Sequence, residues 1–271
     1  MSSFKTIELS DPRFERDGLR HVTVKTPNLQ GRGNVLLYVP PSEYLVGKNI
    51  PIVILLHGVY GSAGVWAMKA GAHLTAQKMM VVEKKVPFIL AMPSDGLWGD
   101  GSGYAKHSGK DFEKWIVEDV PQAVQEAVPQ TSAQSPIFMA GLSMGGYGAL
   151  RLGAKFSKKF KAISGHSSIT RWEEMDLFVE ENISTFAPAE KEQDLIDIFI
   201  KNKKELPPFR FDCGREDDLI EGNRLFHQQL LEADIAHQYE EFSGGHEWIY
   251  WETHLVNTLL FFQKFMFTPK P

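Results

Sequence analysis

The segment over residues 141–145 (Gly-Leu-Ser-Met-Gly) constrains this chain more than any other. An apolar run over 136–140 precedes it and predicts a short buried strand, and small residues after it begin a helix that extends to about residue 155. A serine at a tight strand-to-helix turn, with glycine two positions before and after it, is typical of a nucleophile elbow.

This elbow predicts where the Ser143 side chain lies. The turn strains the serine backbone, and glycines let the chain pass close to its neighbours. The Ser143 hydroxyl then projects above a sheet at a helix N-terminus, where backbone N–H groups and the helix dipole favour developing negative charge. We therefore expect Ser143 to be a catalytic nucleophile.

Composition excludes several classes of protein. The chain has 271 residues, of which 43% are hydrophobic and 23% charged, so it is long enough to bury a core. A net charge of −5 argues against nucleic acid as a partner. The single cysteine, Cys213, excludes an intramolecular disulfide and supports no cysteine-based metal site. Neither a signal peptide nor an apolar run of membrane-spanning length is evident, so we expect a cytoplasmic protein.

The order of predicted elements indicates an α/β fold. A strand over 19–25, a turn over 28–33 and a strand over 34–39 form an N-terminal hairpin. Short apolar runs then alternate with helical segments, and these runs cover 52–57, 87–92, 136–140, 160–164, 209–213 and 238–242. Apolar strands joined by helices predict a mostly parallel central sheet with helices on both faces.

Apolar periodicity predicts helices over 111–128, 219–233 and 247–265, with Pro121 as a kink or restart in the first of them. The segment 167–206 interrupts the alternation and mixes acidic with aromatic residues. We interpret it as a small helical cap over the carboxyl ends of the strands. No linker or repeat is visible, so residues 1–271 are predicted to form a single domain.

A serine hydroxyl needs a base to become a nucleophile, and the base needs an orienting acid. On this kind of fold the chain order is serine, acid, histidine. His246 follows the strand over 238–242, and the glycines at 244 and 245 let its loop curl back toward Ser143. His246 is therefore the predicted general base.

The acid is expected in the loop after the strand over 209–213. Asp217 is the preferred residue, while Asp218 and Glu216 stay alternatives because one sequence does not fix the register of a loop. Asp212 lies within the strand itself and is expected to be structural.

Two backbone donors must await the oxygen anion that forms during acyl transfer. Met144, the residue after the nucleophile, is expected to supply one of them. The other is expected from the loop over 57–62, from Val59 in preference to Tyr60, with His57 holding that loop in place.

Four aromatic residues lie near predicted strand ends or site loops and are candidate substrate-binding residues: Tyr60, Trp98, Tyr104 and Trp248. Cap aromatics such as Trp172 and Phe178 could close over them. An apolar wall with few polar groups suits a small acyl or aromatic ester. Ordinary core packing is the alternative for each of these aromatics.

Four segments together resemble the esterase D family of α/β-hydrolases: 55–58 (Leu-Leu-His-Gly), 141–149 (Gly-Leu-Ser-Met-Gly-Gly-Tyr-Gly-Ala), 212–217 (Asp-Cys-Gly-Arg-Glu-Asp) and 244–248 (Gly-Gly-His-Glu-Trp). The resemblance extends from about residue 34 to 265. It implies the α/β-hydrolase fold and a triad of Ser143, Asp217 and His246. Members are carboxylic or thiol ester hydrolases without metal or organic cofactor, so the implied partner is a small-molecule ester.

Within the family, the segments 92–98 and 103–104 are more similar to those of tributyrin-type short-chain esterases. S-formylglutathione hydrolases tend to have a longer insertion here and a different oxyanion loop. The resemblance therefore favours a short-chain carboxylesterase acting through an acyl-enzyme. A thioesterase of the S-formylglutathione hydrolase type and a silent α/β-hydrolase that only binds ligands are the alternatives, and a homo-oligomer stays open.

Overall fold

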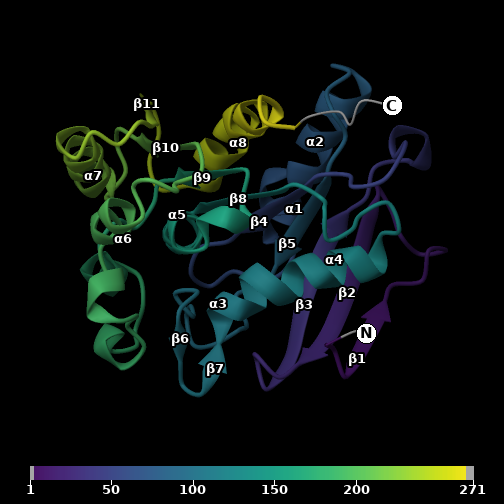
Figure 1. Cartoon of the computed structure of the whole chain (residues 1–271), viewed down its shortest axis with the longest axis horizontal. Helices are drawn as coiled ribbons and strands as arrows, with labels where there is room; N and C mark the ends of the chain where they lie inside the picture. The colour runs from purple at the N-terminus through teal and green to yellow at the C-terminus, as the bar shows by residue number, and fades with distance from the viewer. Residues whose placement is uncertain (1–2, 267–271) are drawn as a thin grey trace.

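A nine-stranded sheet forms the centre of the computed structural model, which describes residues 3–266 (Figure 1). Its strand order is β1-β2-β3-β5-β4-β8-β9-β10-β11. The pairs from β1 to β5 are antiparallel, and those from β5 to β11 are parallel. The strands are β1 Thr6–Leu9, β2 Leu19–Thr26, β3 Gly31–Tyr38, β4 Ile52–Leu56, β5 Ile89–Pro93, β8 Ile137–Leu142, β9 Ala162–His166, β10 Phe209–Gly214 and β11 Gln238–Phe242.

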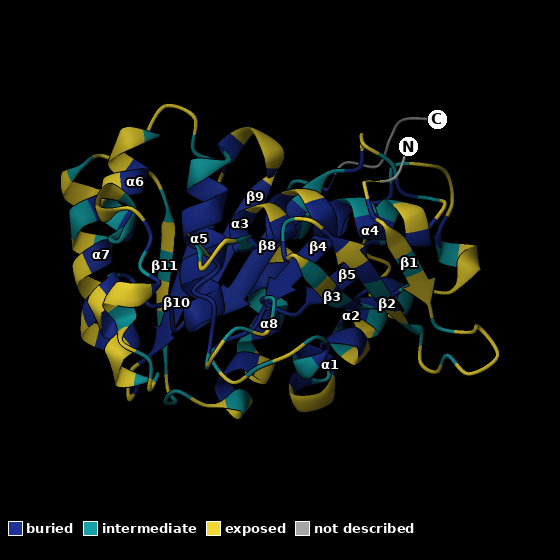
Figure 2. Ribbon diagram, turned by 90° about the horizontal axis from the view of Figure 1, so that it is seen from below, coloured by how far each residue is buried: buried dark blue, intermediate teal, exposed yellow. Residues whose placement is uncertain are grey.

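Helices cover both faces of this sheet (Figure 2). Strand β4 shows why both faces must be covered by helices. Its side chains alternate between the faces, so Ile52 and Ile54 are buried in one core and Val53 in the other. The helices are α1 Val65–Ala70, α2 Ala72–Val81, α3 Phe112–Lys114, α4 Val120–Ala127, α5 Met144–Lys155, α6 Leu195–Lys201, α7 Ile220–Glu232 and α8 Trp248–Gln263. Helices α1, α2 and α8 pack on one face and α3 to α7 on the other.

The predicted hairpin, the six later strands and the three helices are all present; the strand over 238–242 has the predicted ends, and the ends of the others are shifted. The predicted helix over 111–128 is divided: a π-helical turn, η2 (Trp115–Asp119), separates α3 from α4. The interruption comes just before Pro121, which has no N–H to donate to the preceding turn. Strand β1, helices α1 and α2, and the short pair β6 (Lys106–His107) and β7 (Lys110–Asp111) were not predicted.

The segment 167–206 consists of short 3₁₀ turns and α6. Its turns are η4 Trp172–Leu177, η5 Ile183–Thr185 and η6 Glu190–Glu192; two more, η1 Ser42–Tyr44 and η3 Ser157–Lys159, lie elsewhere. Glu192 attaches this segment to α5, because its carboxylate pairs with Lys155 at 2.6 Å and with the buried Arg151 at 3.2 Å. Within residues 3–266, no helix combines the length and apolar character that crossing a bilayer requires.

Candidate active site

The turn between β8 and α5 holds Ser143 in a strained backbone conformation, with φ 55° and ψ −122°. The flanking positions 141 and 145 must be glycine, because a side chain at either one would collide with a neighbouring backbone. A Cβ added at Gly141 would lie 2.1 Å from the carbonyl oxygen of Gly145. One added at Gly145 would lie 2.5 Å from the carbonyl oxygens of Leu56 and His57. The glycines of the Gly-Leu-Ser-Met-Gly motif thus mark positions where backbone segments approach too closely for a residue with a Cβ.

Ser143, His246 and Asp217 form a continuous chain of contacts at the carboxyl end of the sheet. His246 Nε2 lies 3.0 Å from Ser143 Oγ, and His246 Nδ1 lies 3.0 Å from both carboxylate oxygens of Asp217. Because an ionised carboxylate only accepts hydrogen bonds, the Nδ1 proton faces Asp217 and Nε2 is free to accept from the Ser143 hydroxyl.

The three acidic residues of the loop after β10 have different surroundings. Asp217 is buried, and its Oδ1 also accepts a hydrogen bond from the Leu219 N–H at 2.9 Å. Glu216 and Asp218 are exposed, and Glu216 accepts from the Gly244 N–H at 2.6 Å. Burial alone would raise the pKa of Asp217, but its contacts with His246 and Leu219 outweigh burial and lower that pKa.

His57 fastens the loop that follows β4. Its Nε2 accepts a hydrogen bond from the Asp95 N–H at 3.1 Å, so the ring proton is on Nδ1, which lies 2.6 Å from the Gly58 carbonyl oxygen. The Tyr104 hydroxyl donates to the His57 carbonyl at 2.9 Å. Both ring nitrogens of His57 are therefore occupied, one by its own loop and the other by the loop after β5, and are not available for proton transfer at Ser143.

The loop over 58–60 passes beside the nucleophile. A Cβ added at Gly58 would lie 3.2 Å from the Ser143 Cβ. The Tyr60 N–H donates to the Asp100 carbonyl at 2.8 Å, so it points away from the site. The Val59 N–H has no partner among the described residues, and Met144 begins α5, where backbone N–H groups have no helical acceptor.

A cavity of about 200 Å³ opens beside Ser143. Tyr60 and Trp248 line it, as do Phe178, which was expected to close over the site from the cap, and Trp251, which was not predicted there. The Phe178 ring stacks on His246 with centroids 5.0 Å apart. The other lining residues are His57, Gly58, Val59, Gly61, Leu142, Ser143 and His246.

Two of the predicted substrate-binding residues lie outside this cavity. Tyr104 is completely buried beneath the loop that it supports through His57. Trp98 packs edge-on against His107, with ring centroids 4.5 Å apart, and against Phe186 at 4.8 Å. Both residues follow β5, but the chain between them turns back over itself, which periodicity along a sequence does not reveal.

Phe178 and Trp251 carried different sequence signals. Phe178 lies in the interrupted segment 167–206, and its aromatic character there indicated a residue over the site. The Tyr60 hydroxyl donates a hydrogen bond to the carbonyl oxygen of Phe178. Trp251 shares the apolar face of α8, so its sequence position indicated only core packing.

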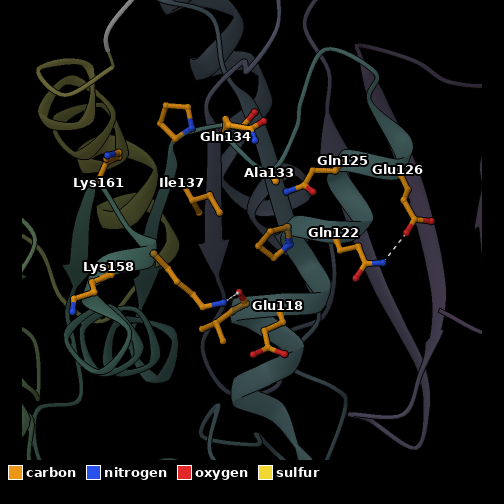
Figure 3. A pocket seen from close by; sticks show the side chains of 14 residues that line it. Glu118, Gln122, Gln125, Glu126, Ala133, Gln134, Ile137, Lys158 and Lys161 are labelled. Carbon is orange, nitrogen blue, oxygen red and sulfur yellow. Dashed lines mark hydrogen bonds between the residues drawn. The ribbon is translucent and has the colours of Figure 1, made fainter. Parts of the chain in front are cut away.

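A larger hollow, about 980 Å³, lies away from these residues (Figure 3). It is an open groove between α4 and the chain entering β8 and β9, with Gln122 and Glu126 on one side and Lys158 on the other. Because the groove borders the amino end of β8 and Ser143 follows its carboxyl end, the groove is not part of the candidate active site.

Asp212 belongs to a buried network beneath the site. Its carboxylate contacts Arg210 at 2.7 Å, the Tyr250 hydroxyl at 2.9 Å and His166 Nδ1 at 3.0 Å. The His166 carbonyl in turn accepts the Ser143 N–H at 2.9 Å. Burial alone would raise the pKa of Asp212, but His166, Arg210 and Tyr250 lower it to about 2.

Replacing Asp212 with asparagine should lower the free energy of unfolding at about pH 7 by about 3 kcal/mol, because it leaves the buried Arg210 guanidinium with less compensation. The ionised carboxylate stabilises the fold fully above its ordinary pKa of 3.8, and this contribution, on the order of 2 kcal/mol, is lost as pH falls through about 2. Urea unfolding of both proteins checks this, and the difference between them should narrow below pH 3.8. Equal urea midpoints for the two proteins at neutral pH would contradict a stabilising role of the Asp212 carboxylate.

The parallel sheet, the strained serine after β8 and the histidine after β11 define the α/β-hydrolase class of serine hydrolases. Within this class, the family model Esterase, described as "Putative esterase", matches residues 26–262, and the chain belongs to that family. It is therefore an enzyme that hydrolyses esters with a serine nucleophile, as its resemblance to esterase D proteins implied.

Curated relatives include an acetyl esterase of Caldicellulosiruptor saccharolyticus, 25% identical over 80% of this chain and 85% of that protein. Esterase Rv1288 of Mycobacterium tuberculosis is also 25% identical over 79% of this chain, which spans only 52% of that longer protein.

Among solved structures, a ferulic acid esterase superimposes with a TM-score of 0.78 at 23% identity, covering 97% of this chain and 99% of its own. An S-formylglutathione hydrolase of Agrobacterium tumefaciens has a TM-score of 0.77 at 16% identity, covering 98% and 100%. These likenesses confirm the fold class.

Proposed function

We propose that this serine carboxylesterase hydrolyses short-chain acyl esters with Ser143 as nucleophile, His246 as general base and Asp217 as orienting acid. The observation that carries the proposal is the unbroken set of 3.0 Å contacts from Asp217 through His246 to the Ser143 hydroxyl. Ser143 and His246 also line the small cavity, so a bound ester would lie beside them.

In this mechanism His246 Nε2 removes the Ser143 proton as Oγ attacks the ester carbonyl. The N–H groups of Met144 and Val59 stabilise the resulting oxygen anion. His246 then protonates the departing alcohol, which leaves an acyl-enzyme on Ser143. A water molecule, deprotonated by the same imidazole, releases the acid. Asp217 keeps the imidazole in the required tautomer and stabilises its charged form.

The cavity restricts the acyl group. Its volume of about 200 Å³ lies below the roughly 300–1,000 Å³ usual for drug-sized ligands. Its side chains are mainly apolar, with Leu142, Phe178 and Trp248 among them, and no lysine or arginine is among the lining residues. A short, uncharged acyl group suits such a site, and the acetyl esterase relative supports the same size class.

A hydrolysis series tests this substrate class. Across p-nitrophenyl esters from acetyl to octanoyl, kcat/KM should be highest for the two-carbon to four-carbon acyl groups and fall at least about tenfold by octanoyl, because forcing extra methylenes into a filled cavity costs about 1–3 kcal/mol. Methyl ferulate and an acetylated sugar test aromatic and carbohydrate esters. A rate that rises steadily to octanoyl would contradict a small acyl site.

The main alternative is hydrolysis of S-formylglutathione, which carries two carboxylates and one ammonium and therefore has a net negative charge. The mouth of the cavity is also acidic: burial, and then the nearby carboxylates of Asp100, Glu180 and Glu181, raise the pKa of the Tyr60 hydroxyl. We therefore favour neutral oxygen esters over this anionic thioester.

The acidic mouth of the cavity should make hydrolysis of the anionic thioester depend on salt concentration. For wild-type protein, kcat/KM on p-nitrophenyl acetate should exceed that on S-formylglutathione. Added salt should raise the rate for the thioester by screening the repulsion and leave the neutral ester nearly unchanged. A thioester rate above that of every oxygen ester would identify a thioesterase instead.

A protein that hydrolyses neither and is not labelled at Ser143 by a fluorophosphonate would be a silent binding protein.

A further inference from the structure

Phe178 places an aromatic ring directly on the predicted base. Its ring stacks on the His246 imidazole at an interplanar angle of 25°, with centroids 5.0 Å apart. Trp251 packs edge-on against the same imidazole, at 88° and 5.0 Å. Both rings line the cavity beside Ser143, but Trp251 is buried and Phe178 only half-buried. Phe178 is therefore the more accessible of these two rings.

The chemistry of the base determines which part of an ester lies next to this ring. His246 Nε2 lies 3.0 Å from Ser143 Oγ, and after the attack the same nitrogen gives its proton to the departing alcohol oxygen. That oxygen must then lie within hydrogen-bond reach of Nε2, at about 2.6–3.2 Å. The carbonyl oxygen turns instead toward the N–H groups of Val59 and Met144. The alcohol group is therefore the part of the ester that lies beside the ring of Phe178 on the imidazole.

We propose that Phe178 determines which alcohols this esterase accepts, by forming one wall of a subsite for a flat, uncharged alcohol group such as benzyl. The proposal rests on the proposed function, because it takes His246 as the group that protonates the alcohol. An aromatic ring offers a second ring an offset-stacked or edge-to-face contact that a short alkyl group cannot make. The rings of Tyr60 and Trp248 line the same cavity, and no lysine or arginine is among its described lining residues, so an anionic alcohol group finds no counter-charge there.

A set of hydrogen bonds holds the backbone around Phe178 at the site. The Glu180 N–H donates to the Asp100 carboxylate at 2.9 Å, and the Asp100 N–H donates to the Glu181 carboxylate at 3.0 Å. The Asp100 carbonyl accepts the Tyr60 N–H at 2.8 Å, and the Tyr60 hydroxyl donates to the carbonyl oxygen of Phe178. These contacts join three segments that are distant in the sequence. The ring is therefore held in place before an ester binds, which reduces the entropy lost on binding.

Phe178→Ala is the direct test, with benzyl acetate and ethyl acetate as paired substrates. The two esters share an acyl group and have alcohols of similar leaving ability, so the ratio of their kcat/KM values reports binding of the alcohol group in the transition state. The amount of active enzyme cancels in this ratio, so a merely structural role of Phe178 would leave the ratio unchanged. We expect wild type to favour benzyl acetate and the ratio to fall about tenfold in Phe178→Ala, through loss of the aromatic contact. Release of acetate measures both rates.

Two further variants separate the ring from its support. Leu177→Ala is the matched control, because it truncates an apolar side chain one residue away that is 65% exposed, and it should keep the wild-type ratio. Asp100 is not among the described residues that line the cavity. Asp100→Ala removes the carboxylate that accepts from the Glu180 N–H and leaves the ring of Phe178 intact, so the ratio should fall by about threefold, less than in Phe178→Ala. An unchanged ratio in Asp100→Ala would overturn the supporting role of these hydrogen bonds.

The outcomes distinguish this inference from the proposed function. If wild type hydrolyses acetate esters and Phe178→Ala keeps the benzyl-to-ethyl ratio, the role of Phe178 is overturned and the proposed function stands. The same holds if Phe178→Ala changes the preference among p-nitrophenyl acyl esters and not the alcohol ratio, which would place Phe178 beside the acyl group. If wild type hydrolyses none of the esters, the proposed function itself fails. Should Phe178→Ala not fold, Phe178→Leu is measured in its place, because leucine stays apolar without the aromatic face, and an unchanged ratio there overturns the inference equally.

Discussion

Replacing Ser143 with alanine should reduce kcat for p-nitrophenyl acetate by about 10⁵-fold to 10⁶-fold, as removal of a triad nucleophile does in other serine hydrolases. Alanine leaves His246 without an oxygen to deprotonate and prevents formation of the acyl-enzyme. Activity that remains should come from substrate binding and the oxyanion donors acting on water. Steady-state hydrolysis measures the effect, and loss of fluorophosphonate labelling provides a second readout.

The fold should survive this change. Alanine keeps the Cβ and removes one partly shielded hydroxyl, so the urea midpoint should stay close to that of wild type, while the strained backbone at position 143 persists. A Ser143→Ala protein that retains activity within about tenfold of wild type and still reacts with the fluorophosphonate would overturn the assignment of the nucleophile.

Asp217→Asn should lower kcat about 10⁴-fold, close to the loss known when a triad aspartate becomes an amide. An asparagine can place its NH₂ toward His246 Nδ1 and stabilise the tautomer whose Nε2 carries the proton, which can no longer accept from Ser143. The loss should appear in kcat and kcat/KM together, since the orienting contact acts on the transition state.

Asp218→Asn is the matched control for this variant. It makes the same chemical change one residue away, on an exposed side chain, and should leave kcat within about threefold of wild type. Comparable losses in the two variants would show that the charge of the loop matters and not the contact with His246. A large loss in Asp218→Asn alone would assign the acid to Asp218.

Local sterics explain why so much of the elbow was visible in the sequence. Gly141 is required by a backbone contact within the turn, and Gly145 by the carbonyl oxygens of Leu56 and His57. Both glycines flank Ser143, so they are visible in the sequence as one motif of five consecutive residues. The strand that precedes Ser143 is buried on both faces and forms a continuous apolar run, whereas the buried strand before Asp217 alternates apolar residues with the ion pair of Arg210 and Asp212. Chain order on this class of fold then supplied the place of His246.

Other features depended on contacts between distant segments. Trp98 and Tyr104 are aromatic residues in a loop of the expected kind, yet the fold turns one toward Phe186 and buries the other beneath His57. Phe178 reaches His246 because the segment 167–206 is attached to α5, and neither its ring position nor that attachment leaves a periodic signal.

The sequence by itself determined the class of fold, the strained serine and the neighbourhoods of the acid and the base, because each depends on residues adjacent in the chain. Only the tertiary structure decided that Asp217 turns inward while Asp218 faces solvent, and that Ser167 adopts a left-handed backbone where it meets Trp251. These choices depend on packing among β9, β10 and α8, whose contacts join residues at least 38 positions apart.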